Sequence, residues 1–175
     1  MYRINIKLIL LFIVFVTNSA FSQTYTAKVV GVTDGDTIKI LKDKQQIKIR
    51  LYGVDTPEKK QDFGSKAKQF TSYLLFGKIV TVKEFDKDRY GRTIALIYIN
   101  GKCLNEELVR NGFAWVYTQY CKESFCLKWP EYQEQAKQSK RGLWSQKNPV
   151  PPWEFRRNWK LSGVNYAASL KIISS

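Results

Sequence analysis

Carboxylates gather at three places in a chain that is otherwise rich in lysine and arginine. They lie in Asp34-Gly35-Asp36-Thr37, in Asp55-Thr56-Pro57-Glu58, and in the pair Asp86 and Asp88. A surface that only binds a polyanion does not ordinarily collect carboxylates. Carboxylate oxygens are hard ligands, and with a backbone carbonyl and waters they bind Ca²⁺ or a similar cation. If antiparallel strands bring the ends of the first two motifs together, Asp36 and Asp55 are predicted to share such a cation.

Each acidic motif taken alone also has a purely structural interpretation. Asp34-Gly35-Asp36 is typical of a two-residue hairpin turn. Thr56-Pro57-Glu58 is typical of the start of a helix, because residues before proline avoid helix and proline suits the first helical turn. The cation site therefore depends on the two motifs meeting in space.

Two arginines near these carboxylates extend the chemistry. Arg50 lies on a predicted strand a few residues before Asp55 and Glu58, and Arg92 ends the loop Asp88-Arg89-Tyr90-Gly91-Arg92. Phosphodiester hydrolysis has a dianionic transition state, which a cation and guanidinium groups stabilise while a base activates water. A single surface arginine is usually only solvated charge, but the combination favours phosphodiester hydrolysis.

The composition excludes most competing chemistries. The chain has 175 residues and a formal net charge of +14, and a protein this basic usually meets a polyanion. It has no histidine, which excludes every mechanism and zinc site that needs an imidazole. Three cysteines without a Cys-x-x-Cys pair exclude zinc ribbons and thioredoxin-type chemistry, and the phosphate-loop pattern is missing.

The first 22 residues have the pattern of a signal peptide. Arg3 and Lys7 precede the apolar run 8–16, and Ala20-Phe21-Ser22 suggests cleavage before Gln23. A membrane span takes roughly 20 apolar residues, and this run is shorter. We therefore expect a secreted or periplasmic protein with no stable membrane anchor.

Hydrophobic periodicity predicts the elements that must position these residues. Alternation predicts five strands, at 25–32, 37–40, 47–52, 79–85 and 93–99. Helical spacing predicts about three helices, near 67–75, 104–109 and 130–140. Five short strands with a helix between the third and fourth favour an α+β, mainly β fold: a five-stranded OB-type barrel at residues 23–145.

Residues 146–175 differ in character and are predicted to form a Pro-, Trp- and Arg-rich C-terminal extension. After Pro149, Pro151 and Pro152, which interrupt regular structure, aromatic residues alternate with Arg156, Arg157 and Lys160. Two interpretations stay open: an aromatic strap on the barrel, or an arm that stacks on single strands and contacts phosphates.

The ordered motifs closely resemble those of the thermonuclease (staphylococcal nuclease-like) family, in the form of a secreted bacterial member. They are 34–37, 50–58, 88–92 and 104–112, within a match from about Tyr25 to Trp144, and 148–154 resembles the tail of secreted members. The resemblance implies a Ca²⁺-dependent endonuclease on an OB barrel that cuts DNA and RNA to leave 3′-phosphates.

The resemblance also implies a role for each matched residue. The catalytic residues are Arg50, Glu58 and Arg92. The calcium ligands are Asp36, Asp55 and the carbonyl of Thr56, with Asp34 behind them to order ligands or water. Arg89 and Tyr90 contact the terminal phosphate of a bound nucleotide, and Tyr120 lines the base pocket, whose second tyrosine position falls on Thr118. The connector from Glu58 to Gly64 is shorter than the family's lysine-rich loop.

Cys121 and Cys126 lie five positions apart in a chain expected to reach an oxidising compartment. A turn between them can bring their Cα atoms within the roughly 4.4 to 6.8 Å that a disulfide allows. We predict this disulfide, with Cys103 a buried free thiol. A bond from Cys103 to one of the other two stays an alternative.

Two other functions compete with the nuclease. One is a non-catalytic nucleic-acid-binding OB module, and the other is a cationic protein that binds anionic envelope polymers or membranes. Neither requires the ordered set of acids and arginines, whereas the nuclease does. We therefore predict an endonuclease, acting as a monomer on DNA and RNA.

Overall fold

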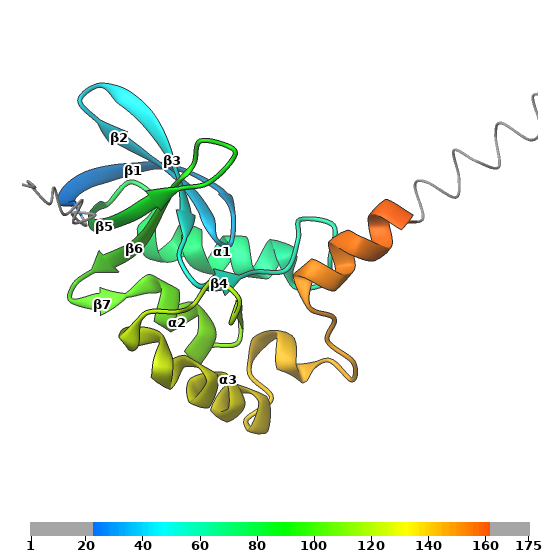
Figure 1. The fold of residues 1–175 in the computed structure, drawn as a ribbon. Coiled ribbons are helices and arrows are strands. Elements are labelled where there is room, and N and C mark those ends of the chain that lie inside the picture. The colour runs from blue at the N-terminus through cyan, green and yellow to red at the C-terminus, as the bar shows by residue number, and fades with distance from the viewer. Residues whose placement is uncertain (1–22, 162–175) are drawn as a thin grey trace, which may run out of the picture.

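A closed barrel of five strands forms one side of the molecule, with the helices beside it (Figure 1). The computed structural model describes residues 23–161, so the predicted signal peptide and residues 162–175 lie outside the described part. The strands are β1 (Thr24–Asp34), β2 (Thr37–Lys42), β3 (Gln45–Leu51), β5 (Ile79–Lys87) and β6 (Thr93–Ile99). They run in the order β3-β2-β1-β5-β6, and a parallel pairing of β3 with β6 closes the sheet. The predicted OB-type barrel is confirmed.

Short strands and helices complete the fold outside the barrel. The two-residue strands β4 (Val54–Asp55) and β8 (Trp115–Val116) pair with each other, and β7 (Lys102–Cys103) pairs with β6 as an antiparallel neighbour. The predicted helices are present as α1 (Gly64–Leu75), α2 (Leu104–Arg110) and α3 (Trp129–Gln138), with 3₁₀ turns at Ser124–Lys128 and Gly142–Ser145. Every helix in residues 23–161 is too short or too polar to cross a membrane.

A further helix, which the sequence analysis did not predict, occupies residues 152–161 and is called the tail helix here (Figure 1, orange). The prolines before it suggested irregular structure. Pro152, however, stands at the first helical position, where the missing N–H has no helical partner in any case.

Alternation along the strands produces the core. Inward positions such as Val29, Ile38, Ile40, Ile49 and Val82 are fully buried, which removes their apolar surface from water at about 25 cal/mol per Å². The intervening positions are free to carry polar side chains. Arg50 takes one of these, next to the buried Ile49.

Two glycines allow the acidic motifs to lie close to α1. A Cβ on Gly35, in the β1–β2 turn, would lie 2.9 Å from the side chains of Thr56 and Ala67. A Cβ on Gly64, the first residue of α1, would clash with the carbonyl oxygen of Glu58. Thr71 in α1 donates a hydrogen bond to the Gly35 carbonyl at 2.6 Å. The two motifs therefore meet because these positions leave room for close backbone approach.

Candidate active site

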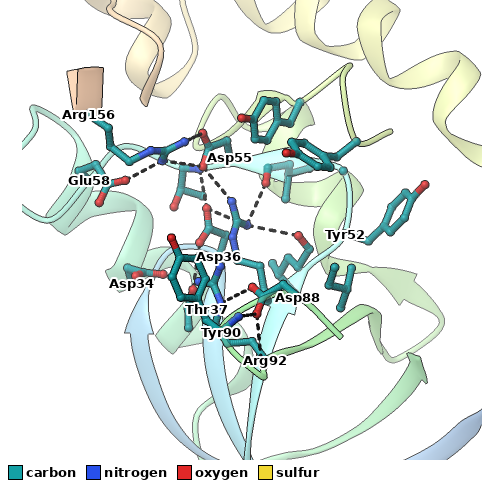
Figure 2. Close-up of a pocket in the computed structure, with 18 of the residues that line it drawn as sticks. Asp34, Asp36, Thr37, Tyr52, Asp55, Glu58, Asp88, Tyr90, Arg92 and Arg156 are labelled. Carbon is teal, nitrogen blue, oxygen red and sulfur yellow. Dashed lines mark hydrogen bonds and ion pairs between the residues drawn. The ribbon is translucent and has the colours of Figure 1, made fainter. Parts of the chain in front are cut away.

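One pocket of about 680 Å³ gathers the predicted functional residues (Figure 2). The β1–β2 turn, the end of β3, the loop after β4, the β5–β6 loop, the segment after β8 and the tail helix all contribute to its wall. The sequence-predicted residues that line it are Asp34, Asp36, Arg50, Asp55, Thr56, Glu58, Arg89, Tyr90, Arg92 and Tyr120. Motifs that are distant in the chain thus meet at one place.

Arg50 ties the two acidic motifs together. Its Nη1 lies 3.0 Å from Asp36 Oδ2, and its Nη2 donates to Asp55 Oδ1 at 2.8 Å. Nη1 also donates to the carbonyls of Val54 at 2.9 Å and Leu51 at 3.2 Å. These contacts fix the plane of the guanidinium inside the pocket.

Asp36 and Asp55 are both buried, which is unusual for carboxylates. Asp36 Oδ2 also accepts a hydrogen bond of 2.7 Å from the backbone N–H of Thr56. Burial raises the pKa of Asp55, and although Arg156 and Arg50 oppose this effect, Asp36 adds to it. The site therefore holds two close carboxylates whose negative charges need compensation.

Asp34 stands beside this pair. Its Oδ1 is buried and has no hydrogen-bond partner among residues 23–161. Burial, followed by the charge of Asp36, raises the pKa of Asp34 to about 7. An unpaired buried acceptor beside two carboxylates is the setting in which a cation or an ordered water provides the missing partner.

The donor set fits a hard divalent cation. Asp36 and Asp55 offer carboxylate oxygens, and the neighbouring Thr56 offers a carbonyl. In the described part of the chain, no group of three or more His, Cys, Asp or Glu side chains is arranged so that it could hold a metal ion by itself. Ca²⁺ and Mg²⁺ accept sites in which waters complete the coordination, so two carboxylates and a carbonyl are compatible with such an ion.

Arg92 is held by Asp88 on the opposite wall of the pocket. Its Nε donates to Asp88 Oδ2 at 2.6 Å, and Asp88 Oδ1 accepts the backbone N–H groups of Tyr90 and Arg92 at 2.9 and 3.0 Å. Burial acts to raise the pKa of Asp88, but these hydrogen bonds outweigh it and hold the pKa below the usual value. Asp88 thus orients Arg92 and shapes the loop that presents Tyr90.

The loop residues predicted to contact phosphate lie at the pocket rim. Arg89 and Tyr90 are exposed, and the guanidinium carbons of Arg89 and Arg92 lie 4.9 and 5.5 Å from the centre of the Tyr90 ring. Two positive groups beside one exposed aromatic ring suit a nucleotide, which has a phosphate and a flat base.

The opposite rim carries a second aromatic group. The rings of Tyr117 and Tyr120 lie 4.7 Å apart and both line the pocket. The resemblance placed the second pocket tyrosine on Thr118, but the structure places Tyr117 beside Tyr120.

Glu58 completes the acidic side of the pocket, and it is paired with a residue that sequence reasoning missed. Its Oε1 accepts a hydrogen bond of 2.7 Å from Arg156 Nη1, and Arg156 also contacts Asp55. The alternation of aromatic and basic residues in the tail pointed to phosphate contacts or a strap. It did not single out Arg156.

The cysteines lie behind the pocket. Cys121 and Cys126 form a disulfide with a Cα–Cα distance of 5.7 Å. Cys103 is a free thiol and is half-buried rather than fully buried as expected. Burial raises its pKa to about 11, so this thiol is inert rather than reactive.

Comparison with known proteins agrees with this geometry. The sequence model of the family described as "Staphylococcal nuclease homologue" matches residues 48–146. An "Uncharacterized endonuclease" of Escherichia coli O157:H7 is 45% identical over 74% of this chain and 83% of its own length. One of Haemophilus influenzae is 40% identical over 91% of this chain and 90% of its own length. A "Micrococcal nuclease" of Shigella flexneri is 38% identical over 76% of this chain and 81% of its own length.

These relatives carry nuclease names and match over most of their length, and the family model covers the part of the pocket that lies between β3 and the segment after β8. The nucleic-acid substrate follows from the same relatives, and the non-catalytic module is not supported. The chain therefore belongs to the staphylococcal nuclease family and is a nuclease.

Proposed function

We propose that this nuclease is a secreted or periplasmic, Ca²⁺-dependent endonuclease that hydrolyses phosphodiester bonds of DNA and RNA to 3′-phosphate products. The observation that carries the proposal is the pocket in which Arg50 bridges Asp36 and Asp55. Glu58 and Arg92 line the same pocket. This set supplies a base, two guanidinium groups and a hard-cation site, as the reaction requires.

In this mechanism Glu58 is the general base. Water attacks the phosphorus, its proton passes to Glu58, and the bond from phosphorus to the 5′ oxygen breaks. The 5′ oxygen takes a proton from solvent water and leaves as a hydroxyl, the phosphate stays on the 3′ side, and Glu58 then returns its proton to solvent. Arg50 and Arg92 neutralise the charge that builds up on the phosphate oxygens.

Asp36, Asp55 and the Thr56 carbonyl hold the calcium in this proposal, with Asp34 behind them. When bound, Ca²⁺ supplies positive charge that offsets the developing negative charge on the phosphate. Arg50 keeps Asp36 and Asp55 close together, because its two nitrogens contact one carboxylate each.

Substrate binding is assigned to the pocket rims. Arg89 and Tyr90 bind a terminal phosphate, and Tyr120 with Tyr117 stacks on a base. The exposed Tyr90 and Tyr120 rings support this assignment, because 69% and 55% of their surface remains available.

The organisation of the chain completes the proposal. Residues 1–22 are a cleaved signal peptide, 23–145 form the nuclease domain, and 146–175 are a C-terminal extension. The enzyme acts as a monomer. The Cys121–Cys126 disulfide supports an oxidising compartment, where such bonds persist.

The test uses purified residues 23–175 with supercoiled plasmid and with RNA, in Ca²⁺ or in excess chelator. We expect cleavage of both polymers in Ca²⁺ only, with products whose 3′ ends are labelled only after phosphatase treatment. Cleavage that persists in chelator, or products with free 3′ hydroxyls, contradicts the proposal.

A further inference from the structure

The tail helix adds a further arginine, Arg156, to the pocket (Figure 2). Arg156 Nη2 lies 2.9 Å from Asp55 Oδ2, and its Nη1 lies 3.2 Å from Asp55 Oδ1. Nη1 also donates to Glu58 Oε1 at 2.7 Å. One guanidinium thus contacts two carboxylates that have other roles in the proposed function. Asp55 binds the cation there, and Glu58 activates water.

These contacts make a strong pairing. Asp55 is buried, and a two-pronged guanidinium–carboxylate contact combines charge with fixed geometry. Burial alone lowers the pKa of Arg156, but the hydrogen bonds to Asp55 and Glu58 outweigh it and raise the pKa above the usual arginine value. Arginine cannot lose its proton in a protein. The positive charge beside Asp55 therefore leaves only if the side chain moves.

Besides the contacts of Arg156, the tail helix is held by aromatic, cation–π and hydrogen-bond contacts. The Trp153 ring lies 5.8 Å from that of Trp115, and Lys60 Nζ lies 5.0 Å from the centre of the Trp159 ring. The Trp153 ring stacks on Tyr117 with centroids 5.2 Å apart and an angle of 8° between the planes. The carbonyl of Val150, just before the helix, accepts a hydrogen bond of 2.6 Å from Gln61. Trp153 and Arg156 lie three positions apart and so share one helix face. Arg156 itself is 39% exposed, which leaves it a path out of the pocket.

Asp55 cannot serve Arg156 and a divalent cation at the same time. Its Oδ1 already accepts from Arg50 and Arg156, and its Oδ2 accepts from Arg156. A cation that coordinates these oxygens has to displace a donor, and it repels the guanidinium at close range. Arg50 is fixed by two carbonyls as well, whereas Arg156 is held through the carboxylates and its helix.

We propose that Arg156 is a tethered gate on the cation site: its guanidinium and a divalent cation compete for the carboxylate of Asp55. The gate rests on the proposed function, which makes Asp55 a cation ligand. Competition is reciprocal, because two ligands that weaken each other do so by the same factor. Removing Arg156 is therefore expected to lower the Kd for the cation. Cation binding is expected to loosen the attachment of the tail helix to the pocket.

The first experiment measures Ca²⁺ binding by isothermal titration calorimetry without nucleic acid. It compares wild-type residues 23–175 with Arg156→Gln and Arg157→Gln. Arg157 is the matched control, because it is the next residue of the same helix, carries the same charge and is exposed. We expect the Kd of Arg156→Gln to fall about tenfold, within the usual range of coupling between sites. The Kd of Arg157→Gln should stay near wild type.

A second variant and a second measurement test the competition independently. Arg156→Lys keeps the charge but loses the two-pronged contact, so its Kd should lie between those of wild type and Arg156→Gln. Hydrogen exchange followed by mass spectrometry should show faster exchange in residues 152–161 of the wild type when Ca²⁺ is added. Arg157→Gln should show the same increase.

Equal Kd values for Arg156→Gln and Arg157→Gln, or weaker Ca²⁺ binding by Arg156→Gln, overturn the gate. Unchanged exchange in the tail helix on Ca²⁺ binding overturns it as well. These results leave the proposed function intact, because they still require Ca²⁺ to bind. A wild type and variants that all fail to bind Ca²⁺ overturn the proposed function and the gate together.

Discussion

Arg50→Lys is expected to remove most of the activity while the barrel stays folded. The guanidinium contacts Asp36 and Asp55 at 3.0 and 2.8 Å and two backbone carbonyls. Lysine keeps the charge but loses the planar fork. Its single nitrogen cannot reach both carboxylates and both carbonyls in the same geometry. The variant therefore loses both the spacing of the acids and a two-pronged contact with phosphate.

The magnitudes separate the catalytic effect from the structural one. A buried acceptor left without a partner costs about 1–3 kcal/mol, and we expect the free energy of unfolding to fall by about that amount. Loss of a donor aimed at transition-state charge lowers turnover by about 10²–10³-fold, or about 2.7–4 kcal/mol. A domain with about 5–15 kcal/mol of stability remains folded after the smaller loss.

The assay is cleavage of a fluorogenic oligonucleotide at saturating Ca²⁺, together with urea unfolding of the same samples. Arg110→Lys is the control, because Arg110 pairs with Glu106 at 2.6 Å in α2 and belongs to no proposed catalytic role. We expect it to keep the wild-type rate and to change stability by less than about 1 kcal/mol. A rate for Arg50→Lys near wild type refutes the assignment of Arg50 to the transition state.

Further predictions concern the base, the second arginine and the thiols. Glu58→Gln should keep Ca²⁺ binding by calorimetry and lose roughly 10²-fold or more in turnover; a rate near wild type means that another group activates water. Arg92→Lys should lower turnover well beyond its effect on urea unfolding, and full activity removes Arg92 from the mechanism. Cys103, with a pKa of about 11, should react with iodoacetamide at pH 8 roughly two orders of magnitude more slowly than in urea; equal rates contradict the burial argument. A non-reduced digest should link Cys121 to Cys126, whereas a peptide pair containing Cys103 contradicts that pairing.

The sequence predicts those parts of the site that follow from local pattern. Strand alternation predicts the barrel. The short motifs at its strand ends predict that Asp36, Asp55 and Glu58 belong to one site, and all three line the pocket. Each motif is only a few residues long, and its neighbours in the chain fix its local conformation. The glycine at position 35 then allows the close approach that brings the motifs together.

Arg156 could not be predicted in the same way. It pairs with Glu58 and Asp55 across 98 and 101 positions of sequence, and its place depends on a helix that the preceding prolines obscured. Many basic residues in this chain compete for any carboxylate, so composition does not identify the partner. The resemblance put the second pocket tyrosine position on Thr118, whereas the structure places Tyr117 beside Tyr120 at the pocket.

The parallel seam between β3 and β6 also determines when in folding the active site forms. Arg50 pairs with Ile94 across this seam, and Arg92 lies just before the paired residues of β6. This parallel pairing joins segments that are far apart in the chain, so the chain between them has to close into a loop before the pairing forms. Until the seam closes, the two arginines are not on the same surface, and the polypeptide has no active site. A nascent or unfolded chain therefore lacks the assembled site.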